Sequence, residues 1–392
     1  MSKEHWICLV GGENTDMIYD AFYCGGRVYF CGSTYSFDGE EKGFLGCVEG
    51  SELVWCKVVR EAGYLSRIVI EDEKLYVCGE YISACFNLAG SPLWMKRGKP
   101  FLGLTKVKEL VAVCGQHGSI AVLNKDDHEY LSKQIFVSEA SGMWTSPFFS
   151  SIGYFRDTLI TVGTCPRVIS RNSKEDCVVV CFDSSLEPVW ALSLGDAESN
   201  LLTGVHCEDS NIFVCGSTKN KTTGKYDILV ACFTENGELK WCTTIGGKSN
   251  EEAYRICSYS GALYIVGYTE SGDLGGHDGF IVVLDKKGKL LKSYIVGGPS
   301  NEGFSTVRAS EKGLLLAGYT ESAGFGKSTG LILQLPYKIT ETTIQNKLKV
   351  KEWKPSVKQW SPQVKQIDLK TSESILKRES FITISWTPKI MI

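Results

Sequence analysis

Seven short apolar segments of this chain each run into a glycine, and this recurrence constrains the fold more than any other feature. Each segment is rich in β-branched or aromatic residues, as expected of a buried β-strand. The segments are residues 28–32, 75–79, 110–115, 159–163, 212–216, 263–267 and 314–318. Successive closing glycines are 47, 36, 48, 53, 51 and 51 residues apart, which is the length of one β-propeller blade.

One repeat contains four strand-like runs. Around the sixth glycine these runs are residues 241–246, 253–257, 263–267 and 278–284, and turn-forming Gly, Asn, Asp and Ser residues separate them. Four short strands joined by tight turns are typical of a propeller blade.

The first residues continue the same spacing. Trp241 precedes the glycine of its repeat by 26 residues, and Trp6 precedes Gly32 by the same 26. The N-terminal segment is thus expected to be the fourth strand of the last blade, whose own repeat supplies three strands. The sequence predicts an all-β fold, a seven-bladed β-propeller over residues 1–337 closed by the N-terminal strand, without free sheet edges at the seam.

Composition argues against several classes of protein. A net charge of −3 provides no general attraction to nucleic acid or to an acidic membrane. The N-terminal apolar run is too short for a secretory signal, and no segment approaches the roughly 18 apolar residues of a membrane span. We therefore expect a cytoplasmic protein with no membrane association.

The sixteen cysteines are predicted to be buried free thiols. Four of them (Cys31, Cys78, Cys114 and Cys215) precede the recurring glycine, at a position that Val or Ala fills in the other repeats. A position shared by Cys, Val and Ala is a small apolar site, which suits a free thiol. The alternative is an intracellular hyperthermophile protein, in which disulfides occur. Its disulfides would then be sought at Cys177, Cys181, Cys207 and Cys257.

Residues 338–392 form a second predicted region, an extended basic arm. The last 57 residues contain no glycine and carry 11 Lys+Arg against 5 Asp+Glu, whereas the preceding 335 residues carry 31 against 40. A seven-residue motif begins at Val350, Val357 and Val364. Proline in the motif excludes a coiled coil despite the heptad period.

Two arrangements of the arm remain open. It lies along the acidic propeller as a strap, or it reaches out to add a strand to a partner or to hold an anionic surface. In the second case the partner-binding residues would be Trp353, Trp360, Trp386, Lys351, Lys354, Lys358 and Lys365.

The sequence contains only weak candidates for catalytic or metal-binding residues. The five histidines share no metal-ligand spacing, and His206, which could face the channel, is interpreted as structural. Asp278 is interpreted as capping a turn rather than binding calcium. A further set of acidic residues follows the Gly-Gly-type corner after each outer strand. They are expected to accept hydrogen bonds from backbone amides at the start of the next inner strand. Alternatively, they bind a cation or a basic partner. They are Glu13, Glu198, Glu251 or Glu252, and Glu302. No catalytic residue, metal or cofactor is expected.

Residues 241–322 carry the pattern Trp-x4-Gly-Gly-x2-Asn-Glu, Leu-Tyr-Ile-Val-Gly-Tyr-Thr-x-Ser and Asp-x-Phe-Ile-Val-x-Leu-Asp-x-x-Gly. This pattern resembles the SBBP-type β-propeller repeats of bacteria and archaea. The resemblance covers roughly residues 1–335 and weakens in blades two to four. It implies a seven-bladed propeller and transfers no catalytic residue.

These observations favour a non-catalytic scaffold or assembly subunit that binds protein partners through its loops and its arm. One alternative is a quinoprotein-like propeller enzyme, because parts of the repeat also resemble the Leu-Asp-x-x-Gly-x-Leu-x-Trp blade motif of such enzymes. Another is an accessory protein that binds nucleic acid or another anionic surface through the arm.

Overall fold

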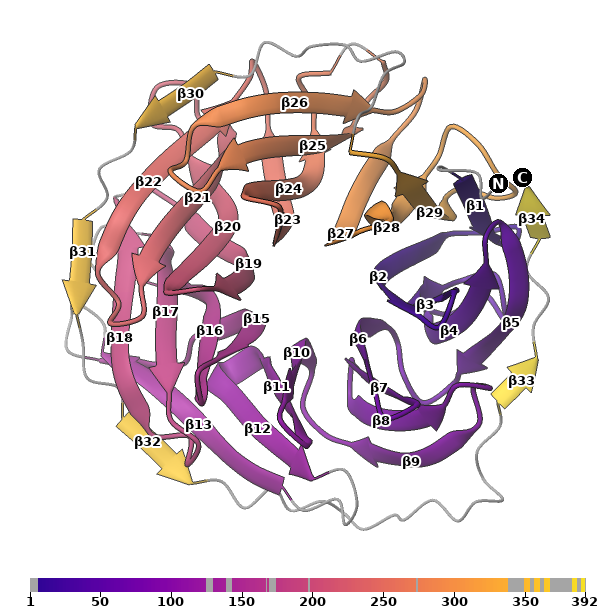
Figure 1. Ribbon diagram of the computed structural model, residues 1–392, viewed down its shortest axis with the longest axis horizontal. Helices are drawn as coiled ribbons and strands as arrows, with labels where there is room; N and C mark the ends of the chain where they lie inside the picture. The colour runs from indigo at the N-terminus through magenta and orange to yellow at the C-terminus, as the bar shows by residue number, and fades with distance from the viewer. Residues whose placement is uncertain are drawn as a thin grey trace.

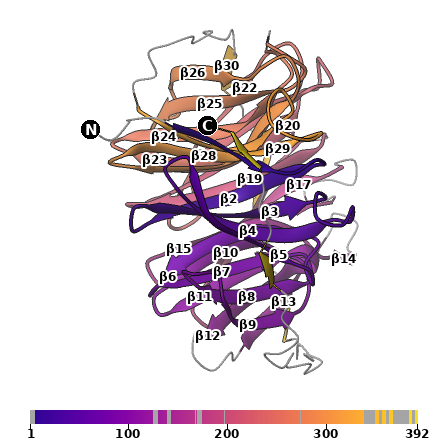
Figure 2. The same cartoon turned by 90° about the vertical axis from the view of Figure 1, so that its right-hand side faces the viewer.

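Seven antiparallel sheets form a ring around a central channel (Figure 1). The computed structural model describes residues 6–124, 130–138, 143–166, 168, 174–196, 198–272 and 274–337, and five segments of the arm at 349–352, 356–359, 363–366, 383–385 and 389–391. In the side view of Figure 2 the strands run across the thickness of the ring, so their connections form its two faces. The predicted seven-bladed all-β propeller is confirmed.

Each blade has four strands, ordered from the channel outward. Blades one to three are β2 (Asp16–Cys24), β3 (Arg27–Thr34), β4 (Lys42–Glu49) and β5 (Glu52–Val59); β6 (Leu65–Glu71), β7 (Lys74–Gly79), β8 (Ile82–Asn87) and β9 (Pro92–Arg97); and β10 (Phe101–Val107), β11 (Leu110–Gly115), β12 (Ser119–Asn124) and β13 (Tyr130–Ser138). The short β14 (Trp144–Thr145) pairs with β13.

Blades four to seven follow the same order. They are β15 (Phe148–Phe155), β16 (Thr158–Cys165), β17 (Asp176–Phe182) and β18 (Pro188–Gly195); β19 (Asn200–Glu208), β20 (Asn211–Lys219), β21 (Tyr226–Thr234) and β22 (Leu239–Gly246); β23 (Glu251–Tyr259), β24 (Ala262–Thr269), β25 (Asp278–Asp285) and β26 (Leu290–Val296); and β27 (Glu302–Ser310), β28 (Gly313–Thr320), β29 (Thr329–Leu335) and β1 (Trp6–Gly11). The helical segment among the described residues is a 3-10 turn, η1 (Gln116–Gly118), and no described helix is long and apolar enough to cross a bilayer.

The N-terminal strand closes the ring as predicted. β1 pairs antiparallel with β29, with Trp6 opposite Gln334 and Val10 opposite Gly330. Cys8 and Val10 are fully buried, packed with residues of blades seven and one. The seam is therefore held by sheet hydrogen bonds and by an apolar core together.

The recurring glycine is explained by a β-bulge on the neighbouring innermost strand. All seven innermost strands shift register by one residue opposite that glycine, for example between Ala253 and Arg255 in β23. A Cβ added at Gly267 would lie 1.8 Å from the carbonyl oxygen of Glu252. A Cβ added at any of the other six glycines would lie 1.9–2.1 Å from a carbonyl oxygen. Only glycine fits so close to a neighbouring backbone.

Neighbouring blades pack through seven apolar clusters, one at each interface around the ring. Outer-strand tryptophans join three of the interfaces by a hydrogen bond. The indole Nε1 of Trp55, Trp190 and Trp241 donates to a turn carbonyl of the next blade at 3.1, 2.9 and 3.0 Å. Each blade is thus joined to both of its neighbours by an apolar cluster.

All sixteen cysteines are free thiols, and thirteen of them are buried. Cys31, Cys78, Cys114 and Cys215 are fully buried, as are Val162, Val266 and Ala317 at the same repeat position. The prediction of buried thiols is confirmed, and the alternative of disulfides at Cys177, Cys181, Cys207 and Cys257 is wrong.

Short arm strands lie on the outer edge of the ring (Figure 1). β30 (Lys349–Glu352), β31 (Ser356–Gln359) and β32 (Gln363–Gln366) pair antiparallel with β22, β18 and β13, the outer strands of blades five, four and three. β33 (Thr383–Ser385) pairs with β5, and β34 (Lys389–Met391) pairs with β1. The arm therefore follows the ring in the direction opposite to the order of the blades.

Candidate functional site

The predicted partner-binding lysines occupy one repeated position on the outer edge. Lys351, Lys358 and Lys365 lie opposite Thr244, Ser193 and Gln134, on blades five, four and three. The other four predicted residues, Trp353, Trp360, Trp386 and Lys354, lie outside the described residues. A role of these seven residues in partner binding stays a prediction.

A second candidate site, which the sequence reasoning did not single out, is the central channel. Two cavities meet inside it, one of about 550 Å³ and one of about 620 Å³, and Arg67 lines both. The first opens toward the loop face, which carries the longer loops such as 35–41 and 270–277. The second opens toward the turn face, which carries two-residue turns such as 25–26 and 260–261.

The bulges supply the layers of side chains in this channel. A bulge re-aims the side chain of the extra residue. In every innermost strand the bulge residue lies 13 positions before the recurring glycine, and these residues line the loop-face cavity: Tyr19, Ser66, Leu102, Ser150, Thr203, Tyr254 and Ser305. One position later comes the next layer, formed by Asp20, Arg67, Gly103, Ser151, Gly204, Arg255 and Thr306.

Four tyrosines dominate the loop-face cavity. Tyr19 and Tyr64 meet edge to face with ring centroids 6.1 Å apart, and Tyr254 and Tyr319 also line the cavity. Burial raises the pKa of all four hydroxyls, that of Tyr64 to about 12. They are therefore neutral hydrogen-bond donors and acceptors near pH 7.

Carboxylates stand beside these tyrosines. Glu252 accepts a hydrogen bond from the Tyr254 hydroxyl at 3.4 Å. The charges of Glu80 and Glu41 are close enough to Tyr64 to contribute to its raised pKa. The loop-face cavity thus combines aromatic walls with negative charge at its margin.

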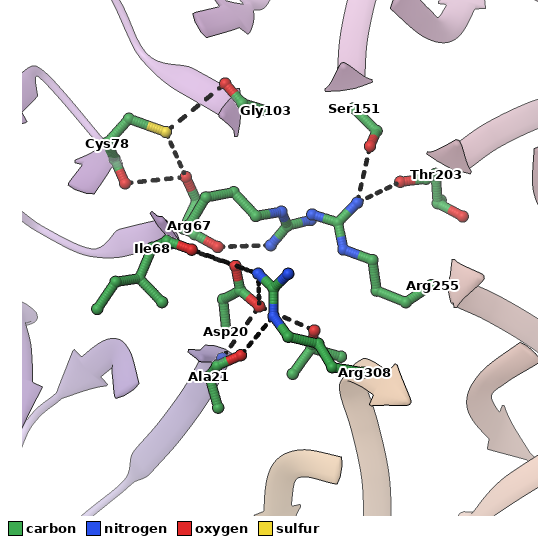
Figure 3. A network of polar contacts seen from close by, with 12 residues as sticks. Asp20, Ala21, Arg67, Ile68, Cys78, Gly103, Ser151, Thr203, Arg255 and Arg308 are labelled. Carbon is green, nitrogen blue, oxygen red and sulfur yellow. Dashed lines mark hydrogen bonds and ion pairs between the residues drawn. The ribbon is translucent and has the colours of Figure 1, made fainter. Parts of the chain in front are cut away.

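Three arginines line the turn-face cavity, and one of them, Arg67, lines both cavities. Figure 3 shows Arg67, Arg255 and Arg308 converging from three blades onto the channel. Arg308 pairs with the buried Asp20 at 3.1 Å and donates to the carbonyl oxygens of Ala21 and Ile68. Arg255 donates to Ser151 Oγ at 2.8 Å and to the Thr203 carbonyl oxygen at 3.4 Å.

The turn-face cavity contains paired polar groups. His206 lines it and lies 2.9 Å from Ser258 Oγ, and burial lowers the pKa of its imidazole. Lys106 pairs with Glu71 at 2.6 Å. His206 thus faces the channel. It is also a hydrogen-bonded residue, in agreement with its interpretation as structural.

The recurrent acidic residues near the blade corners have a structural role. Glu251 and Glu302 are buried and accept the backbone amides of Gly247 and Gly298 at 2.7 and 2.6 Å. In blades one and five the predicted Glu13 and Glu198 are wrong for this position, because Asp16 and Asn200 begin the innermost strands there. The residues that occupy this position in the four blades each accept a hydrogen bond from a threonine 18 positions later. The acceptors are Asp16, Asn200, Glu251 and Glu302, and the donors are Thr34, Thr218, Thr269 and Thr320.

Asp278 also serves its own turn, since its carboxylate is buried and accepts the amide of Leu274 at 3.4 Å. Among the described residues no group of three or more His, Cys, Asp or Glu side chains is arranged to hold a metal ion.

Comparisons with known proteins support the fold. The WD40 domain of Pan2 from Neurospora crassa has a TM-score of 0.56 and 12% identity, with 88% of this chain and 99% of that chain covered. BamB from Moraxella catarrhalis has a TM-score of 0.44 and 13% identity, with 83% and 85% covered. No protein-family model matches the chain, and no curated protein matches its sequence. At 12% identity the likeness to the Pan2 domain shows the propeller fold alone, and the resemblance to SBBP-type repeats stays a prediction.

Proposed function

We propose that the protein is a non-catalytic scaffold that binds a peptide segment of a protein partner in the loop-face cavity. The observation that carries this proposal is the cavity of about 550 Å³ lined by Tyr19, Tyr64, Tyr254 and Tyr319. This volume lies within the usual range of about 300–1,000 Å³ for ligand sites. Tyrosine is enriched at protein interfaces because it combines a large apolar face with a polar end.

The inserted segment is proposed to carry a lysine or an arginine. Tyrosine faces attract cations, and the carboxylates of Glu41, Glu80 and Glu252 stand beside the tyrosines. A basic side chain can therefore contact aromatic rings while its charge meets a carboxylate.

The arm and the compartment belong to the same proposal. A propeller whose outer edge is followed by a basic arm has a second contact surface for a partner. A cytoplasmic location is supported by the sixteen free thiols, which a reducing compartment maintains. No observation on the described residues favours the quinoprotein or the nucleic-acid alternative.

The proposal is tested by selecting peptides from a random display library against the intact chain. Selected peptides should contain a basic residue and should bind Tyr64→Ala at least tenfold more weakly than the parent protein. The matched control is Tyr23→Ala, which changes a tyrosine of the turn-face cavity and should alter affinity less than twofold. Peptides that bind Tyr64→Ala as tightly as the parent, or a selection without enrichment, would refute the proposal.

A further inference from the structure

The layer of arginines that lines the turn-face cavity carries more positive charge than its surroundings balance. Arg67, Arg255 and Arg308 bring three guanidinium groups into one section of the channel, where the described residues supply one carboxylate, that of Asp20, in an ion pair. The formal charge of this section is therefore +2.

Arg308 is the arginine whose charge is neutralised by an ion pair. Asp20 holds it from one side, and the ring of Phe22 lies 4.5 Å from its guanidinium carbon. Asp20 is itself fully engaged, because it also accepts from Thr306 Oγ1 at 2.8 Å and from the amide of Ile68 at 3.2 Å. Its carboxylate has little capacity left for another arginine.

Arg67 and Arg255 lack such a partner. Within the described part of the chain neither forms an ion pair, and the Nε of Arg67 is buried without an acceptor. Arg67 donates to its neighbour's carbonyl oxygen, that of Ser66, and Arg255 uses Nη1 for both of its hydrogen bonds. Figure 3 shows the two guanidinium groups directed toward one another across the channel. Two like charges in this arrangement repel, and a buried donor without an acceptor costs stability.

The neighbouring thiols do not compensate this charge. Burial raises the pKa of Cys78 to about 12, and the pKa of Cys31 and of Cys114 well above its ordinary value, so all three are neutral near pH 7. Farther along the turn-face cavity, the carboxylates of Glu71 and Glu208 are already paired with Lys106 and Lys286.

We propose that the channel binds a phosphate group between Arg67 and Arg255, either as inorganic phosphate or as the monoester of a small organic molecule. A dianion balances the formal charge of +2, and guanidinium groups bind phosphate oxygens in bidentate fashion. The group enters from the turn face, because the cavity of about 620 Å³ on that side is lined by all three arginines. That volume leaves room for the organic part of a monoester. This site shares Arg67 with the lining of the proposed peptide site, but it opens toward the opposite face of the ring.

The test measures binding of sodium phosphate and of phenyl phosphate to the intact chain by isothermal titration calorimetry in chloride buffer. Both should bind and raise the midpoint of thermal unfolding, whereas chloride at equal ionic strength should not. Arg67→Met should weaken phosphate binding at least tenfold. Arg156→Met is the matched control on the turn face, where Arg156 is exposed and paired with Glu235, and it should change affinity less than twofold.

Arg255→Lys keeps the charge and removes the planar fork, so it should weaken binding at least threefold, and it replaces Arg67→Met if that variant does not fold. Equal affinities identify inorganic phosphate as the ligand, and tenfold tighter binding of phenyl phosphate identifies a monoester. The proposal is overturned if neither compound binds better than chloride, or if Arg67→Met and Arg255→Lys bind as Arg156→Met does. Peptide binding to the tyrosine-lined cavity is measured separately, so failure of one proposal does not imply failure of the other.

Discussion

At the scale of single residues, one glycine per blade determines what faces the channel. The glycine permits the close approach of the innermost strand, and the resulting bulge directs two consecutive residues inward instead of one. The residues 13 and 12 positions before each glycine can thus be named from the sequence once the bulge is known. Without the bulge, simple alternation would assign one of each pair to the interior of the blade, which is why Arg67 and Arg255 were missed.

Replacing Gly267 by alanine should lower the free energy of unfolding by about 3 kcal/mol, because the new methyl group overlaps a backbone carbonyl that cannot move away alone. Gly98→Ala is the control, since its Cβ would meet nothing closer than 3.9 Å. Urea unfolding followed by circular dichroism measures both. Equal stability of the two variants would contradict the bulge as the reason for the glycine.

The buried carboxyl of Glu251 should make stability depend on pH. Burial raises its pKa in the folded state above the ordinary value of 4.5, so the folded state binds the proton more tightly than the unfolded state. Its contribution is most favourable below about pH 4.5 and is lost as the pH rises through the folded-state pKa. Glu251→Gln should therefore gain stability relative to the parent between pH 4.5 and 7.

Urea unfolding at several pH values measures this difference. Glu311→Gln, at an exposed turn, is the control and should run parallel to the parent. A difference between Glu251→Gln and the parent that does not grow with pH would contradict the prediction.

At the scale of elements, the arm strands repeat in step with the blades. β30, β31 and β32 begin at residues 349, 356 and 363, seven residues apart, and each pairs with the next blade along the ring. Seven extended residues span about 23 Å at roughly 3.3 Å each. The heptad in the arm is thus a spacing between outer strands rather than the signature of a coiled coil.

A chain ending at Tyr337 should lose protection on the outer strands that the arm covers. Hydrogen–deuterium exchange of amides in residues 192–195 and 243–246 should become faster, because these edges would pair with water instead of with β31 and β30. The interior strand β24 is the internal control and should exchange unchanged. Unaltered exchange at both edges would show that the arm does not occupy them in solution.

At the scale of the whole molecule, most of the fold could be predicted from the sequence, because the strands and glycines of each blade recur at regular intervals along the chain. The 26 residues from Trp6 to Gly32 were enough to assign β1 to the last blade, and Val10 is indeed opposite Gly330. The channel could not be predicted, because its chemistry differs from blade to blade. One repeated position holds Asp20, Arg67, Ser151 and Arg255, and such variation is visible as a site only when the ring is assembled.

Ring closure should be sensitive to the buried face of β1 and indifferent to its outer face. Val10→Asp places a charge in the apolar core between blades seven and one, and it should cost about 3 to 5 kcal/mol of unfolding free energy. Ile7→Asp is the matched control on the same strand, because Ile7 is 51% exposed, and it should change stability by about 0.5 kcal/mol or less. Chemical denaturation compares the two, and similar losses would contradict closure through this strand.

The pairing of β1 with β29 has a consequence for the growing chain during translation. Residues 6–10 find their partners only when residues 330–334 have left the ribosome, and β34 then covers the remaining edge of the same strand. Until residues 330–334 are available, β1 has no partner strand in the described part of the chain, and its unpaired amides are a hazard for intermolecular association.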